Sequence, residues 1–212
     1  DLSKNAALIQ LNCYNNRLTA LDLSENTALT KLFCGYNPLT ELDVSRNTKL
    51  TELLCHENQL TALDLTHNTA LATVYCPNNR LTALDLSKNT ALATLACSRN
   101  QLTALDLSQN TAITELYCNN NQLAALHLSR NTALTELYCN GNRLTTLDLS
   151  RNTELTKIYC DDNPLTELNI SNLSKIEEIV FGDNPEINVI ANSQTVVSDE
   201  VRHYMDGKRK TP

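Results

Sequence analysis

Apolar residues recur along this chain with a fixed 21-residue period, without a gap, from Leu18 to Pro185. Each repeat contains two similar halves. The first half reads L-x-x-L-x-L-x-x-N, as in residues 18–26, and the second reads L-x-x-L-x-C-x-x-N, as in residues 29–37. In the first half two apolar residues flank one that is not apolar, and in the second half Leu and Cys flank a variable residue, which favours a short β-strand with one buried face. A fixed period of this length predicts a β-rich solenoid, because it leaves no room for a long helix between strands.

The repeats predict one continuous domain over residues 1–185, followed by a cap and tail over residues 186–212. The array starts in mid-repeat, continues with seven full copies from Leu18, and ends in a degenerate copy at Leu165. We expect about nine turns, with the second halves forming a parallel concave sheet and the first halves forming short strands or extended segments on the convex side. Because both halves share one motif, the reverse assignment is also open. In the tail, the sequence from Ser198 to Gly207 predicts a short helix.

Cysteine marks the same position in the second half of successive repeats. The eight residues are Cys13, Cys34, Cys55, Cys76, Cys97, Cys118, Cys139 and Cys160. They lack the clustered spacing of a zinc site. Stacked side chains leave neighbouring strands in parallel directions, so their Cβ atoms stay about 4.8 Å apart instead of closing to the roughly 3.8 Å of a disulfide. We therefore predict free, buried thiols that fill the core.

Two polar columns also recur once per repeat. Each half ends in an asparagine, whose amide can bind backbone groups of neighbouring turns where the chain bends. The first half carries an acidic column, namely Asp22, Asp43, Asp64, Asp85, Asp106 and Asp148, interrupted by His127 and Asn169. We expect these carboxylates to bind nearby backbone or hydroxyl groups. Calcium is the alternative, but it needs six to eight oxygens around one ion.

The outward positions of the second half are where the copies differ most. The aromatic and aliphatic candidates are Phe33, Leu54, Tyr75, Tyr117, Tyr138 and Tyr159, and the polar candidates are Glu52, Glu115, Glu136, Lys157 and His56. In a parallel in-register sheet they form continuous stripes along the solenoid. These side chains could merely shield the sheet, since strands favour aromatic residues. The second interpretation is a ligand-binding surface, because tyrosines with a polar rim suit protein or sugar recognition.

Composition and charge exclude several classes of function. The net charge of −7 argues against a nucleic-acid-binding surface, and no apolar run is long enough to span a membrane. The four histidines have no fixed relation to a nucleophile, and the common catalytic motifs are missing. We therefore expect a protein that is not an enzyme and that has neither a cofactor nor a metal site.

The segment L-x-x-L-x-C-x-x-N-x-L, at residues 29–39 and 50–60, resembles the conserved segment of leucine-rich repeats. The doubled halves resemble the short bacterial subclass with 21-residue units, the IRREKO type, and the broader family includes internalin-like surface proteins. This resemblance covers residues 2–185. It implies a right-handed superhelix, ligands on the concave sheet, and a place at the bacterial cell surface or outside the cell.

Three functions follow as hypotheses. The first is a protein–protein interaction module of a surface or secreted protein, serving adhesion or contact with a host. The second is carbohydrate recognition by the tyrosines, and the third is a structural spacer within a larger protein. We also expect the unpaired N-terminal strand edge to favour self-association.

Overall fold

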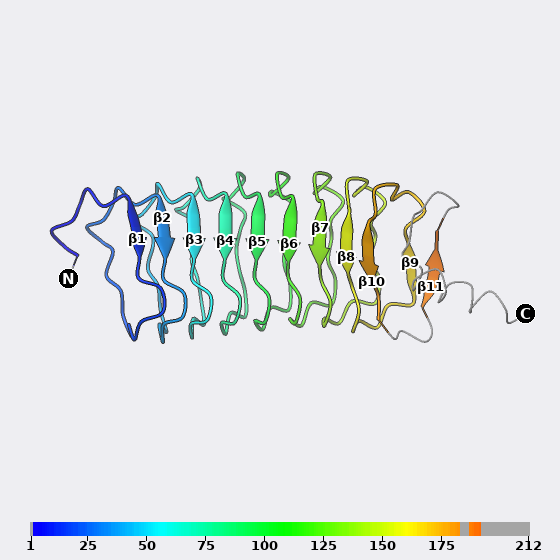
Figure 1. Ribbon diagram of the computed structural model, residues 1–212, viewed down its shortest axis with the longest axis horizontal. Coiled ribbons are helices and arrows are strands. Elements are labelled where there is room, and N and C mark those ends of the chain that lie inside the picture. The colour runs from blue at the N-terminus through cyan, green and yellow to red at the C-terminus, as the bar shows by residue number, and fades with distance from the viewer. Residues whose placement is uncertain (1, 183–186, 192–212) are drawn as a thin grey trace, which may run out of the picture.

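The chain winds as a solenoid along one long axis in the computed structural model, which describes residues 2–182 and 187–191 (Figure 1). The expected helix from Ser198 to Gly207 lies outside these residues. Nine three-residue strands form one parallel sheet in the order β1 to β8 and then β10. They are β1 (Gln10–Asn12), β2 (Lys31–Phe33), β3 (Glu52–Leu54), β4 (Thr73–Tyr75), β5 (Thr94–Ala96), β6 (Glu115–Tyr117), β7 (Glu136–Tyr138), β8 (Lys157–Tyr159) and β10 (Glu178–Val180).

The strands pair in strict register. Leu32 pairs with Leu53, for example, and Tyr117 pairs with Tyr138, so each residue faces its equivalent in the next repeat. The nine strands thus delimit eight complete turns. All nine come from the cysteine-bearing half, which confirms the predicted parallel sheet. Within the described residues, no helix is long and apolar enough to cross a membrane.

Among the residues that the structure describes, the first half of most repeats contains no strand. The exceptions are β9 (Glu167–Asn169) and β11 (Asn188–Ile190), which pair with each other in a two-stranded sheet. Elsewhere in this half the chain turns back on itself, and the backbone N–H of Asn89 donates to the carbonyl of Leu86 at 3.0 Å. Nearly every first half is therefore an extended segment followed by a turn, which is one of the two forms that the sequence predicts.

The core is a thin aliphatic layer that runs the length of the solenoid. The central residue of each strand from β2 to β10 is buried, and seven of the eight cysteines are buried beside it. All eight cysteines are free thiols, as predicted. Burial raises the pKa of Cys34 and Cys76 to about 12, so these thiols stay protonated at neutral pH.

Both asparagine columns bind the backbone, which confirms their structural role. In the second half, the Asn100 amide donates to the carbonyls of Cys76 and Cys97, and its Oδ1 accepts the N–H of Leu81 at 3.0 Å. In the first half, the Asn110 amide donates to the carbonyls of Leu86 and Asn89. Its Oδ1 is buried and has no hydrogen-bond partner among the described residues. The two columns thus connect neighbouring turns to different extents.

Candidate functional site

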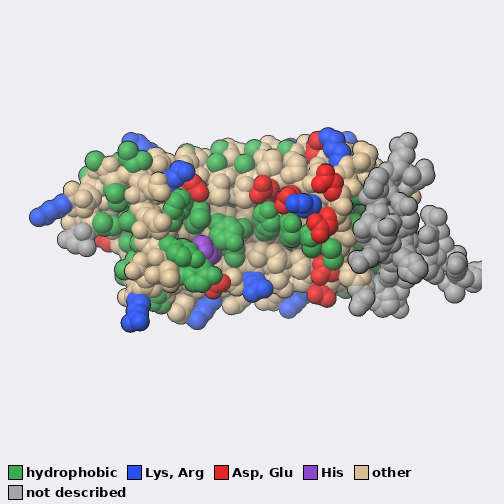
Figure 2. All heavy atoms as spheres, in the orientation of Figure 1, with side chains coloured by type: hydrophobic (Ala, Val, Ile, Leu, Met, Phe, Trp, Pro, Cys, Tyr) green, Lys and Arg blue, Asp and Glu red, His purple; other side chains and the backbone are tan. Residues whose placement is uncertain are grey.

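The outward face of the nine-stranded sheet carries all the side chains that the sequence marks as candidates. Because residues alternate along a strand, the first and third residues of each strand face outward while the middle one enters the core. Figure 2 shows hydrophobic side chains gathered across the middle of the view, over β2 to β8, with acidic and basic side chains among them. Most candidates here are half-buried, and Tyr75 is 40% exposed.

Toward the C-terminal end, Tyr117, Tyr138 and Tyr159 form a parallel stack, called here the tyrosine stack. Their ring centroids lie 4.7 and 4.5 Å apart, with interplanar angles of 25° and 11°. These distances match the spacing of about 4.8 Å between neighbouring strands, so the sheet itself sets the stacking distance. Each ring restricts its neighbour, which leaves a surface with little side-chain freedom.

Charged side chains hold the hydroxyl ends of the tyrosine stack. The Tyr117 hydroxyl donates to Glu136 Oε2 at 3.0 Å, and the Tyr159 hydroxyl donates to Glu178 Oε1. The Lys157 ammonium in turn contacts Glu136 Oε1 at 2.9 Å. The bond from Lys157, together with that from Tyr117, lowers the pKa of Glu136. Hydrogen bonding to Glu178 and burial raise the pKa of Tyr159 to about 12, so this hydroxyl remains a donor at neutral pH.

Toward the N-terminal end, four rings form a second group, called here the histidine cluster. His56 lies at its centre, with ring centroids 5.6 Å from Tyr14, 5.2 Å from Tyr36 and 4.9 Å from Tyr75. The His56 ring is nearly perpendicular to those of Tyr36 and Tyr75, unlike the parallel rings of the tyrosine stack. A Cβ atom on Gly35 would lie 2.6 Å from His56 Cε1, so this glycine makes room for the imidazole. Burial lowers the pKa of His56, which favours the neutral ring.

The turn residue Tyr36 is expected near this face from its place in the repeat, but the sequence does not indicate that Tyr14 lies beside it. Neither occupies a strand, because Tyr14 follows Cys13 directly and Tyr36 lies in a turn with a φ of 54°. Tyr14 follows Cys13 by one residue, whereas Tyr36 follows Cys34 by two, so the two tyrosines do not occupy equivalent positions in the repeat. The one available signal was the absence of a side chain at Gly35, next to Tyr36.

The remaining candidates lie at the N-terminal part of the same face. The Lys31 ammonium and Glu52 Oε2 form an ion pair at 2.8 Å between β2 and β3. Phe33 and Leu54 are half-buried on these two strands. The structure thus keeps the expected stripe of Tyr117, Tyr138 and Tyr159 together and adds a second aromatic group around His56.

A hollow of about 540 Å³ separates the histidine cluster from the tyrosine stack. It spans β4, β5 and β6, with Tyr75 on one side, Tyr117 on the other and the small side chain of Ala96 between them. Its remaining lining residues are Pro77, Asn78, Thr94, Ser98, Arg99, Glu115 and Asn119. The hollow exists because the third residue of β5 is an alanine, whereas the third residues of β4 and β6 are tyrosines.

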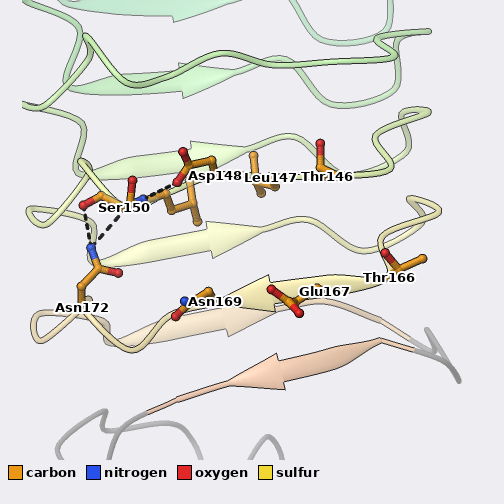
Figure 3. A pocket seen from close by; sticks show the side chains of 9 residues that line it. Thr146, Leu147, Asp148, Ser150, Thr166, Glu167, Asn169 and Asn172 are labelled. Carbon is orange, nitrogen blue, oxygen red and sulfur yellow. Dashed lines mark hydrogen bonds between the residues drawn. The ribbon is translucent and has the colours of Figure 1, made fainter.

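The first halves carry smaller hollows lined in part by the acidic column. One of about 310 Å³ lies beside Asp148 and Glu167 (Figure 3). The N–H of Ser150 donates to Asp148 Oδ1 at 2.9 Å, and the Asn172 amide donates to the Ser150 carbonyl at 2.9 Å. The same aspartate-to-backbone bond recurs from Asp22 to Asp148, which confirms the expected role of these carboxylates. Over the described residues, no three His, Cys, Asp or Glu side chains group as metal ligands.

Comparisons with known proteins place this architecture among bacterial solenoids. No protein-family model and no curated protein matches the chain. The functional domain of InlJ from Listeria monocytogenes, described as including a cysteine ladder, superposes with a TM-score of 0.85 and 41% identity over 92% of this chain and 46% of that one. YopM, a leucine-rich effector protein from Yersinia pestis, superposes with a TM-score of 0.73 and 27% identity over 89% of this chain and 52% of that one.

A third structure, internalin C2 from Listeria monocytogenes, has a TM-score of 0.80 and covers 84% of this chain and 83% of its own. Its identity of 22% supports the fold alone. This chain spans about half the length of the InlJ and YopM chains that it matches. The eight cysteines of this chain form a column with one residue in each successive repeat, and the InlJ domain is likewise described as including a cysteine ladder.

Proposed function

Because this chain is a leucine-rich repeat protein of the short, internalin-like class, we propose that it is a protein-binding module that uses the outward face of its sheet. The proposal covers a non-enzymatic role in adhesion or host contact, at the bacterial surface or outside the cell, with the sheet face as the concave side. The observation that carries it is the tyrosine stack, whose rings are fixed by stacking and whose Tyr117 and Tyr159 hydroxyls donate to carboxylates.

Fixed aromatic side chains suit protein recognition for a physical reason. Tyrosine contributes a large contact area with few rotatable bonds, so little conformational entropy is lost when a partner binds. Here the neighbouring rings and the Glu136–Lys157 pair already restrict the tyrosines before binding. Such pre-organised aromatic groups are typical of the few residues that dominate binding energy in protein interfaces.

The test removes the tyrosine stack and leaves the core unchanged. The variant Tyr117→Ala, Tyr138→Ala, Tyr159→Ala should lose a partner that binds the wild-type chain, with affinity reduced at least about a hundredfold because several hot-spot contacts disappear. Surface proteins extracted from cultured host cells would supply the partner, identified by crosslinking to the wild type and then measured by calorimetry.

The control variant changes three exposed threonines of the first halves, Thr61→Ala, Thr82→Ala and Thr103→Ala. It should bind the partner as the wild type does. Denaturant unfolding of both variants checks that the fold is kept. Equal binding by the tyrosine variant and the wild type would reject the proposal, and a glycan-array signal that depends on the same tyrosines would favour carbohydrate recognition instead.

A further inference from the structure

The hollow at Ala96 lies at a position that carries a tyrosine in four other turns. The third residue of the strand is Tyr75 in β4, Tyr117 in β6, Tyr138 in β7 and Tyr159 in β8, but Ala96 in β5. Because the strands pair in register, Ala96 sits one strand step from Tyr75 and one from Tyr117. The hollow is therefore a missing ring within the run of tyrosines from β4 to β8.

The tyrosine stack shows how a ring in this column binds its acceptor. The hydroxyl of Tyr117 donates to Glu136, and that of Tyr159 donates to Glu178. In both cases the acceptor is the first residue of the next strand in the sheet. The ring thus lies along the face and its hydroxyl reaches a carboxylate of the following turn.

By the same relation, a tyrosine hydroxyl at position 96 would donate to Glu115, the first residue of β6. Glu115 lines the hollow, and the Tyr117 hydroxyl makes only a long contact of 3.5 Å with its Oε2. The turn at Ala96 therefore lacks the tyrosine but retains the carboxylate that would accept its hydroxyl. At the other side of the hollow, Ser98 Oγ and Asn119 Oδ1 already form a hydrogen bond of 2.5 Å with each other.

We propose that this hollow binds a tyrosine side chain of a protein partner, with the ring between Tyr75 and Tyr117 and the hydroxyl donating to Glu115. Ala96 is only 1% exposed, so its methyl is already covered by the surrounding residues, and the incoming ring would contact mainly the two flanking tyrosines. This proposal deepens the protein-binding function and relies on it only for the identity of the molecule that carries the tyrosine.

The lining favours a phenol over other flat or ring-shaped groups. A phenylalanine ring would cover Glu115 without offering it a donor, and an unpaired desolvated carboxylate is unfavourable. A sugar ring presents several hydroxyls, but the Ser98 and Asn119 groups on the far side are bonded to each other. One aromatic ring with one hydroxyl matches the one carboxylate and the apolar sides.

The test uses p-cresol, which reproduces the tyrosine side chain, and requires no knowledge of the partner. In a titration of ¹⁵N-labelled chain followed by NMR, p-cresol should shift the amides of β4, β5 and β6 around Ala96, with a Kd on the order of ten millimolar for so small a molecule. Toluene, which lacks the hydroxyl, and methyl glucoside should bind at least about fivefold more weakly.

Two variants locate the effect at the hollow. Ala96→Tyr supplies the ring from within the chain and should abolish the p-cresol shifts, whereas the control Ala125→Tyr, at an exposed alanine of a first half, should leave them unchanged. Glu115→Gln keeps the shape and removes the charge, so it should weaken p-cresol about fivefold with little effect on toluene.

Shifts that are absent, that are spread evenly over the histidine cluster and the tyrosine stack, or that persist in Ala96→Tyr would overturn the proposal. Stronger shifts with methyl glucoside than with p-cresol would overturn it in favour of a sugar site. Because this experiment uses no partner protein, it can fail while the tyrosine stack still binds one, and it can succeed even if the stack binds none.

Discussion

In the half-repeat that starts at Leu92, the N–H groups of Cys97 and Arg99 donate to carbonyls of the next turn at 2.8 and 2.9 Å. In the half-repeat that starts at Leu81, the N–H of Ser87 instead donates to Asp85 Oδ1 within the same turn, at 2.9 Å. A ladder of backbone bonds connects the second halves of neighbouring turns, whereas the first halves are connected mainly by asparagine amides, such as that of Asn110 to the carbonyls of Leu86 and Asn89. The spacing between turns is therefore set on the sheet side, where the aromatic side chains stack at the same spacing.

This difference explains why variation among the copies has consequences mainly on the sheet face. A side chain on the sheet lies about 4.8 Å from its equivalents in the two adjacent turns, so replacing one ring by a methyl group changes the surroundings of both neighbours. On the other half, Asp and Ser recur almost unchanged because each turn uses them for its own hydrogen bond. The comparison between the halves can be tested with matched substitutions.

The largest expected effect concerns the two asparagine columns. Asn100→Ala removes the Oδ1 that accepts the Leu81 N–H and the amide group that donates to the carbonyls of Cys76 and Cys97. It should lower the free energy of unfolding by about 4 kcal/mol. Asn110→Ala removes two donated bonds and an Oδ1 that had no partner among the described residues, and should lower it by about 2 kcal/mol. Both substitutions delete the same atoms, so the cavity contributions are comparable. Urea unfolding measures the difference, and equal losses would mean that the bond to Leu81 adds nothing.

A smaller effect is expected at the equivalent core position of each half. Leu86 and Cys97 are both buried, with 1% and 0% exposure. Leu86→Ala should lower the free energy of unfolding by about 3 kcal/mol, since it deletes three carbon atoms and leaves a cavity. Cys97→Ala deletes a single sulfur atom and should lower it by about 1 kcal/mol. A loss at Cys97 as large as that at Leu86 would contradict the view that this cysteine only fills the core.

The smallest effect concerns pH and the acidic column of the first half. The Ser87 N–H lowers the pKa of Asp85, and the Ser108 N–H does the same for Asp106. Because the folded pKa lies below the unfolded value of about 3.9, these bonds stabilise the fold above that pH and lose this contribution as pH falls through the folded value. Asparagine makes the same bond without titrating, as Asn169 does with Ser171 at 3.0 Å.

The double variant Asp85→Asn, Asp106→Asn should therefore lose less stability than the wild type between pH 7 and pH 3. Urea midpoints at the two pH values measure this. A drop identical to that of the wild type would show that the two carboxylates do not contribute to acid sensitivity.

Much of the fold could be predicted from the sequence because the period repeats many times. The core positions, the free thiols and the asparagine contacts all follow from the position of a residue within the repeat. The motif alone did not decide which half forms the sheet, since Leu and Asn occupy the same places in both. The halves differ in how they use their backbone N–H groups. In the first half the Ser87 N–H donates to Asp85 within the same turn, whereas in the second half the Cys97 N–H donates to the carbonyl of Tyr117 in the next turn.

The candidate site was harder to predict, because it depends on contacts between copies that differ. The columns placed Tyr117, Tyr138 and Tyr159 together, and the structure stacks them. The columns could not show that His56 packs against Tyr14 and Tyr36, because side chains outside the strands do not follow the register of the sheet. The importance of Ala96 emerged only when the bonds from Tyr117 and Tyr159 to a carboxylate of the following turn were visible.

The strict register of the sheet also has an evolutionary consequence. Exchange between two copies within the gene moves the sequence by whole repeat units, which keeps every asparagine contact and every core position in place. A single exchange of this kind would transfer the alanine at position 96, with its hollow, to another turn, or would add a tyrosine to the stack. The outward face of the sheet can therefore be rearranged in steps of one turn without any change in the contacts that fold the chain.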